Sequence, residues 1–188
     1  MAVNVSPGGD GLLSTIANTA WLNAALTDFD FEVERSANGP AEPVHLADGR
    51  RLTMFAGDAA GGAFLFAGEG GEERPVVYAG SEGTGGLIAM GVREAVAMVV
   101  HLPSLHDALS APLDDGTQLR ERLERAEREI REYVPNVAEI RARVAAALDL
   151  PPADGLLERL HAAAVDDGYV VVSDEGNRYD PLAVWLRT

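Results

Sequence analysis

The chain has 188 residues and contains neither cysteine nor lysine. Without cysteine it can form no disulfide bond and no zinc–thiolate centre, and it offers no cysteine nucleophile. All fifteen basic residues are arginines. Because proteins without disulfides are typical of a reducing cytoplasm, a cytoplasmic location is the simplest expectation.

Long hydrophobic runs and targeting signals are also missing. The amino-terminal segment MAVNVSPGGDG has no basic residue, and the apolar stretch LLSTIANTAWLNAAL is too short and too polar for a membrane span. We therefore expect no signal peptide and no membrane partner.

Basic residues are few relative to acidic ones, and the net charge is −15. The excess is uneven, with 16 acidic and 5 basic side chains in residues 1–116 but 14 and 10 in residues 117–188. Such a surface repels nucleic-acid phosphates and anionic lipids and attracts positively charged proteins. A high net charge also increases solubility. The acidic excess therefore favours a basic protein partner without requiring one.

The most regular pattern lies between Arg51 and Met90. Four short apolar runs begin near residues 51, 63, 75 and 87, a step of twelve residues, and glycine clusters separate them. This spacing predicts an antiparallel meander. The continuous runs Phe64–Phe66 and Val76–Tyr78 predict central strands covered on both faces by helices. Strands paired in sequence order would place loops 57–62 and 80–86 at one end of the sheet and loop 68–74 at the other.

Helical periodicity flanks the meander on both sides. Asp10 is positioned to cap the first helix. Asn136 and Glu139 are spaced as a capping box for a later one. The predicted helices cover residues 12–26, 92–102, 117–134, 136–148 and 156–165.

Shorter patterns predict extended segments. Apolar and acidic residues alternate over Phe29–Glu34, which predicts an edge strand with one acidic face or an extended acidic loop. Val44–Leu46 and Leu52–Met54 predict a hairpin across Asp48-Gly49. Tyr169–Val172 predicts a further strand.

Together these elements predict an α+β fold in which a twisted, antiparallel-rich sheet is flanked by helices. Residues 1–116 would form the α+β core. Residues 117–188 would form a helical extension that ends in a short strand or hairpin and packs on that core.

The segment AGSEG around Ser81 comes close to the Gly-x-Ser-x-Gly nucleophile elbow of hydrolases. An elbow requires a helix directly after the serine. Here TGGLIAM follows, which predicts a glycine turn and a strand. A tight turn is therefore the favoured interpretation, and a hydrolase that uses Ser81 is kept as an alternative.

No cofactor or metal site is expected. The glycines from Gly80 to Gly85 have phosphate-loop spacing, but neither the lysine nor the hydroxyl of such a loop follows. His101 and His106 are five residues apart with a proline between them, so they cannot share a helix face as zinc-binding pairs do.

The glycine pair Gly61-Gly62 before AFLFA, followed by PVVYAGSEG, LIAM and REAVAMVV, resembles the SUKH superfamily over residues 45–101. That superfamily includes fungal cell-wall-synthesis regulators and many bacterial immunity proteins. The resemblance implies a protein that acts by protein–protein contact and is not an enzyme. The matching positions, most of them structural, are Gly61, Gly62, Pro75, Tyr78, Ser81, Glu82 and Ala89.

The resulting functional hypothesis is an antitoxin-like immunity protein that binds a cognate toxin, with nucleases as natural candidates. An intracellular regulatory scaffold of the same superfamily is the alternative. The sequence leaves a monomer and a dimer open. The strand order predicts the partner-binding residues, with Asp58 and Glu82 on one rim of the sheet and Glu69, Glu72 and Glu73 on the opposite rim.

Overall fold

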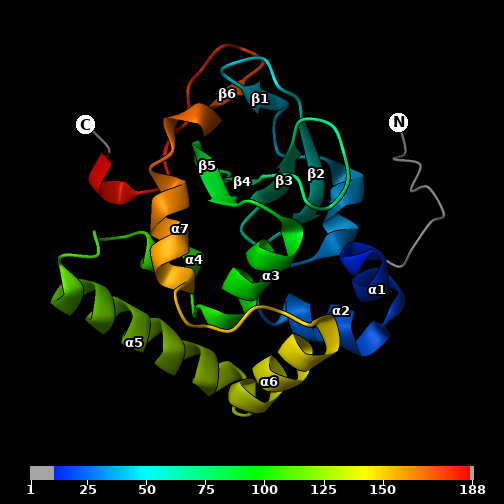
Figure 1. Cartoon of the computed structure of the whole chain (residues 1–188), viewed down its shortest axis with the longest axis vertical. Helices are drawn as coiled ribbons and strands as arrows, with labels where there is room; N and C mark the ends of the chain where they lie inside the picture. Colours follow the sequence, from blue (N-terminus) through cyan, green and yellow to red (C-terminus); the bar gives the residue numbers. More distant parts are fainter. Residues whose placement is uncertain (1–10, 187–188) are drawn as a thin grey trace.

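A computed structural model describes residues 11–186, which are built around a five-stranded sheet in the order β2-β3-β4-β5-β7. Figure 1 labels the first four of these strands. The first four strands form antiparallel pairs, and β5 and β7 are parallel. This confirms the α+β fold class and the antiparallel meander. The strands are β2 Leu52–Gly57, β3 Ala63–Ala67, β4 Val76–Ala79, β5 Thr84–Ala89 and β7 Asp180–Pro181.

The central strands are buried on both faces, as their continuous apolar runs predict. Phe64 and Phe66 of β3 join the larger hydrophobic cluster on the helical side. Leu65, between them, joins a second cluster on the opposite face because successive strand residues alternate in direction. That opposite face is covered by a small sheet, so the expectation of helices on both faces is wrong.

The small sheet pairs β1 (Val44–Leu46) with β6 (Val171–Ser173), at the top of the view in Figure 1. The predicted Asp48-Gly49 turn forms, with the Gly49 N–H donating to the Leu46 carbonyl over 2.8 Å. The strand before the turn nevertheless pairs with β6, and only a single bridge, His45 to Arg51, joins it to the strand after the turn. The hairpin prediction therefore named the wrong partner, because Leu46 is buried against Val171 in the second cluster.

The amino-terminal helix is divided in two. α1 (Leu12–Asn18) and α2 (Ala20–Thr27) are separated at Thr19, whose backbone is extended. The prediction of one continuous helix is wrong at this residue. The predicted cap Asp10 and the segment before it lie outside the described residues.

The acidic segment after α2 is not an edge strand. One bridge joins Glu32 to Gly57, and the chain then forms the 3-10 helix η1 (Val33–Asn38). Asp30, with a φ of 62°, interrupts the extended path. Phe31 is fully buried and its ring centroid lies 5.1 Å from that of Phe64, so the apolar half of the alternating pattern serves the core.

Four of the later helices, over residues 92–101, 116–133, 137–148 and 156–164, occur where helical periodicity predicts them. The capping box at Asn136 does not form, because the side chain of that residue makes no cap hydrogen bond. The helices are α3 Val92–His101, α4 Leu105–Ala108, α5 Gly116–Tyr133, α6 Val137–Leu148 and α7 Leu156–Ala164, followed by the 3-10 helices η2 Asp167–Tyr169 and η3 Val184–Leu186. No helix of the described residues is long and apolar enough to cross a membrane.

Residues after 116 share the main core with residues before it. Val144, Leu148, Leu156 and Leu160 belong to the same hydrophobic cluster as α3 and the helical face of the sheet. The strand β7 adds an edge to that sheet. The division of the chain at residue 116 stays a prediction.

His161 joins the carboxy-terminal helix α7 to α4. Its ring is 5% exposed, stacks on Trp185 with a centroid distance of 5.0 Å, and has Nε2 2.7 Å from the Ala108 carbonyl oxygen. Burial lowers the pKa of His161 below its usual 6.5. The neutral ring is therefore the form that the fold favours.

We predict that His161 makes the folded state sensitive to acid. Below pH 6.5 the unfolded chain binds a proton at this position before the folded protein does, so stability is lost as the pH falls from 6.5 towards the lowered pKa. Urea denaturation of the wild type and of His161→Gln, which keeps an N–H donor, measures this at pH 7.5 and pH 5.5. The wild type should lose more stability between the two pH values than the variant, and equal losses would contradict the prediction.

Candidate functional site

Three loops meet at one end of the five-stranded sheet. The Asp30 carboxylate accepts a hydrogen bond of 2.8 Å from the Ala59 N–H, which ties the segment after α2 to the β2–β3 loop. The Ser81 hydroxyl donates over 2.8 Å to the Ala60 carbonyl oxygen, which ties the β4–β5 turn to the same loop. Loop 57–62 and the turn after β4 therefore share one end of the sheet, as the meander predicts, although β5 begins at Thr84 and shortens the predicted loop 80–86.

Asp58 is the buried anchor of this end. Its side chain is only 6% exposed, and its carboxylate accepts hydrogen bonds from the Gly62 N–H at 2.7 Å and from the Tyr78 hydroxyl at 2.5 Å. Burial and the neighbouring carboxylates of Asp58 and Asp30 raise the pKa of Tyr78 far above its usual 10. Asp58 lies at the predicted end of the sheet, but its side chain is buried and hydrogen-bonded, so it does not present a charge on the outer surface.

No cation of the described residues neutralises Asp58. Its polar contacts are the Gly62 amide and the Tyr78 hydroxyl, and no arginine or histidine in residues 11–186 makes an ion pair with it. Buried charges in proteins are usually paired with a charge of opposite sign or coordinate a cation. An uncompensated buried carboxylate is therefore an unusual feature of this end of the sheet.

A cavity of about 680 Å³ opens beside Asp58. Its size lies within the range of sites that bind small molecules or single side chains. Exposed carboxylates of Asp28, Asp30 and Glu82 contribute to its lining, and no arginine does. The apolar part of the lining comes from β3, β5 and the helices α3 to α5, and includes Phe64, Ile88, Val99, Leu102, Leu105, Leu109 and Ile130.

The opposite end of the sheet carries the other predicted acidic residues. Glu69 and Glu73 are exposed. Glu72 is half-buried, and its carboxylate accepts the backbone N–H groups of Leu12 and Leu13 at 2.7 and 3.0 Å. It therefore caps the start of α1 from sixty residues away. This is a structural role, because a negative charge at the positive end of the helix dipole stabilises the helix. Glu82 is exposed at the cavity end, so the structure keeps the two acidic rims apart.

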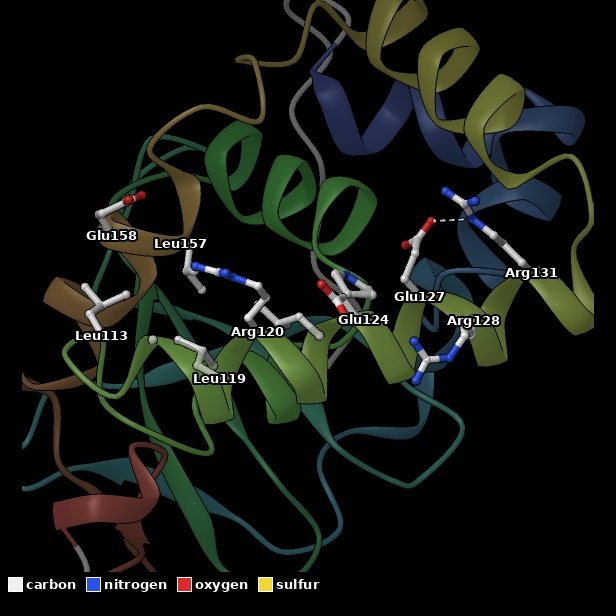
Figure 2. A pocket seen from close by; sticks show the side chains of 12 residues that line it. Leu113, Leu119, Arg120, Glu124, Glu127, Arg128, Arg131, Leu157 and Glu158 are labelled. Atoms are coloured by element: carbon white, nitrogen blue, oxygen red, sulfur yellow. Dashed lines mark hydrogen bonds and ion pairs between the residues drawn. The ribbon is translucent and has the colours of Figure 1, made fainter.

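The helix α5 borders a second recess, also of about 680 Å³ (Figure 2). Leucines from α5 and α7 form its apolar part, among them Leu119 and Leu157, and Arg120 reaches from α5 towards Leu157. Glu127 pairs with Arg131 at 3.0 Å. Because its rim carries charges of both signs, this recess has no clear preference for a charged partner.

Ser81 lacks the surroundings of a catalytic nucleophile. Gly83 turns the chain with a φ of 79°, and the strand β5 follows where an elbow requires a helix. His106 also lines the cavity, but the Ser81 hydroxyl donates to a backbone carbonyl and makes no hydrogen bond with that histidine. The interpretation of AGSEG as a tight turn is confirmed. No cluster of three or more histidine or carboxylate residues suited to a metal ion occurs in residues 11–186.

Sequence reasoning missed Asp28, Asp30 and the apolar wall of the cavity. The acidic segment was visible in the sequence, but its position beside loop 57–62 depends on the Glu32–Gly57 bridge and on the turn at Asp30. Part of the wall comes from α4, a helix of four residues after Pro103. Helical periodicity alone cannot show that such a helix borders a cavity.

No protein-family model, curated protein or solved structure matches the chain. The resemblance to the SUKH superfamily therefore rests on the strand spacing and the glycines of residues 45–101.

Gly62 is required by the close approach of Asp58 and Tyr78. A Cβ atom at this position would collide with the Tyr78 hydroxyl and with Oδ2 of Asp58. We predict that Gly62→Ala lowers the free energy of unfolding by about 1–3 kcal/mol, the usual cost of overpacking. Urea denaturation measures the change.

The matched control is Gly71→Ala in the loop at the opposite end. No atom lies within 4 Å of a Cβ there. Its effect should stay within about 0.5 kcal/mol. Equal denaturation midpoints for the two variants would show that the Asp58–Tyr78 contact does not constrain Gly62.

Proposed function

We propose that this protein is a non-enzymatic protein-binding domain that binds a basic partner protein at the acidic end of its sheet. The observation that supports this most is the cavity of about 680 Å³ with Asp28, Asp30, Asp58 and Glu82 in its lining and no arginine. A surface of this kind is complementary to a partner that carries arginine or lysine side chains on a protruding loop.

The charge of the whole chain supports the same partner class. A net charge of −15 attracts a basic protein over distances longer than any contact and raises the association rate. The exposed carboxylates at the cavity then fix the orientation of the bound partner. Because salt screens charges separated by more than about 10 Å at 0.1 M, this attraction weakens as salt is added.

The partner that we propose is a toxin, and the role is that of an immunity protein in the cytoplasm of the producing cell. The SUKH resemblance suggests this role, and nucleases are natural candidates because their active sites attract phosphates and are positively charged. An acidic protein blocks such a site without chemistry of its own and without binding nucleic acid. A regulatory scaffold that binds a cellular enzyme would use the same surface, and a toxin gene immediately upstream would favour the immunity role.

The test reverses two exposed charges at the cavity end. We predict that the double variant Asp28→Arg, Glu82→Arg associates with the toxin encoded beside this gene at least about tenfold more slowly at low salt. Neither side chain makes a hydrogen bond or ion pair within the described residues, so the fold should be unaffected. Stopped-flow association measured against ionic strength gives the rate.

Two double variants serve as controls with the same change in net charge. Glu69→Arg, Glu73→Arg alters the opposite rim, and Glu121→Arg, Glu129→Arg alters the exposed side of α5. Both should slow association less than the cavity-end variant. A salt-independent rate, or a larger loss from either control, would contradict the proposed binding site.

A further inference from the structure

We propose that the cavity beside Asp58 binds an organic cation carried on a compact apolar body. Two sources share this chemistry, namely a free amine without a carboxylate and an arginine or lysine side chain of the partner protein. The second source rests on the proposed function, whereas the first does not.

The buried carboxylate of Asp58 is the first reason. It is 6% exposed, lines the cavity and has no cationic partner in residues 11–186. Each carboxylate offers about four acceptor sites, and the Gly62 N–H and the Tyr78 hydroxyl occupy two of those on Asp58. An ammonium or guanidinium group in the cavity would supply the missing charge and use the remaining acceptors.

The neighbouring carboxylate of Asp30 strengthens the preference for a cation. Asp30 and Asp58 both line this cavity. Asp30 has a positive φ and is held by the Ala59 N–H, which fixes its position. The backbone of Asp30 and the hydrogen bond to its side chain thus hold its carboxylate at the cavity that the buried Asp58 also lines.

The apolar wall defines the rest of the ligand. Phe64 and Ile88, which are at most 2% exposed, line the cavity together with Leu105 of α4. Phe64 and Tyr78 meet edge to face at 5.2 Å. This wall suits an aromatic or aliphatic body, because burying apolar surface is favourable whereas burying further polar groups without partners is not.

The same lining excludes anions and zwitterions. No arginine lines the cavity, and Asp28 and Glu82 would repel a carboxylate at the same end of the sheet. A free amino acid should therefore bind poorly. An amine without an acid group, or a side chain within a protein, meets the requirement.

The experiment uses the full chain and 2-phenylethylamine as the probe, followed by isothermal titration calorimetry at pH 7.5. The matched neutral probe is 2-phenylethanol, which has the same body without the charge. We expect the amine to bind at least about tenfold more tightly than the alcohol, the effect of one charge-assisted hydrogen bond. The dipeptide acetyl-Phe-Arg-amide represents the side-chain source.

Charge removal assigns the binding to this cavity. Asp30→Asn keeps an acceptor for the Ala59 N–H and should weaken amine binding several-fold, and Asp58→Asn should weaken it further. Glu69→Gln at the opposite end should leave it unchanged. If Asp58→Asn fails to fold, Asp30→Asn alone decides the result, because its side chain is exposed.

Equal affinities for amine and alcohol, or amine binding that Asp30→Asn does not change, would overturn the proposal. If the dipeptide binds and saturating amine slows association with the partner, the partner supplies the cation. If only the amine binds and association is unaffected, the ligand is the free amine. Salt-dependent association of the partner without any amine binding would refute this inference and leave the proposed function intact.

Discussion

The arrangement of the acidic end depends on one buried hydrogen-bonded carboxylate. Asp58 accepts from the Gly62 amide within its own loop and from the Tyr78 hydroxyl on β4, so a single side chain joins the β2–β3 connection to a strand two positions along the sheet. Leaving either donor unsatisfied in this buried setting would cost about 1–3 kcal/mol. The loop has therefore one favoured position, and the segments that bond to it, through Asp30 and Ser81, take their positions from it.

The cavity exists because the two faces of the sheet are covered differently. The small sheet β1–β6 covers Leu65 and Val77 closely. On the other face, α3 packs against β5 through residues that are almost fully buried, whereas α4 is a single turn of four residues. The space between this short helix, the sheet and α5 is lined by half-buried Leu102, Leu105 and Ile130. The acidic loops and the apolar wall thus meet at the cavity, because the helix that covers this part of the sheet, α4, has only four residues.

Local pattern predicted most of the elements, and tertiary competition decided the rest. The twelve-residue spacing of the apolar runs predicted the meander. Helical periodicity predicted the long helices, and prolines marked where some of them end. β1 shows the limit: its turn to the next strand was correct, yet burial of Leu46 against Val171 pairs it with a strand more than a hundred residues away. The acidic segment after α2 kept its period-2 burial, but the left-handed Asp30 and the 3-10 helix from Val33 leave only a single bridge at Glu32.

The candidate site was predicted in part. Strand order placed the Asp58 and Glu82 loops at one end of the sheet, and the hydrogen bond from Ser81 to the Ala60 carbonyl agrees with this placement. Strand order could not show that the Asp58 carboxylate is buried. Its burial depends on the hydrogen bond from Tyr78, which reaches it from β4. Glu72 likewise caps α1, a helix sixty residues away along the chain, and no local sequence pattern predicts this contact.

The central claim is that a basic partner binds at the cavity end of the sheet. The most direct measurement is amide chemical-shift mapping of the nitrogen-15-labelled chain as the proposed basic partner protein is added. We expect the largest changes to fall together in residues 27–30, 58–62 and 81–84. Changes concentrated instead along α5 and α7, around Leu119 and Leu157, would contradict it and place the interface at the recess of mixed charge.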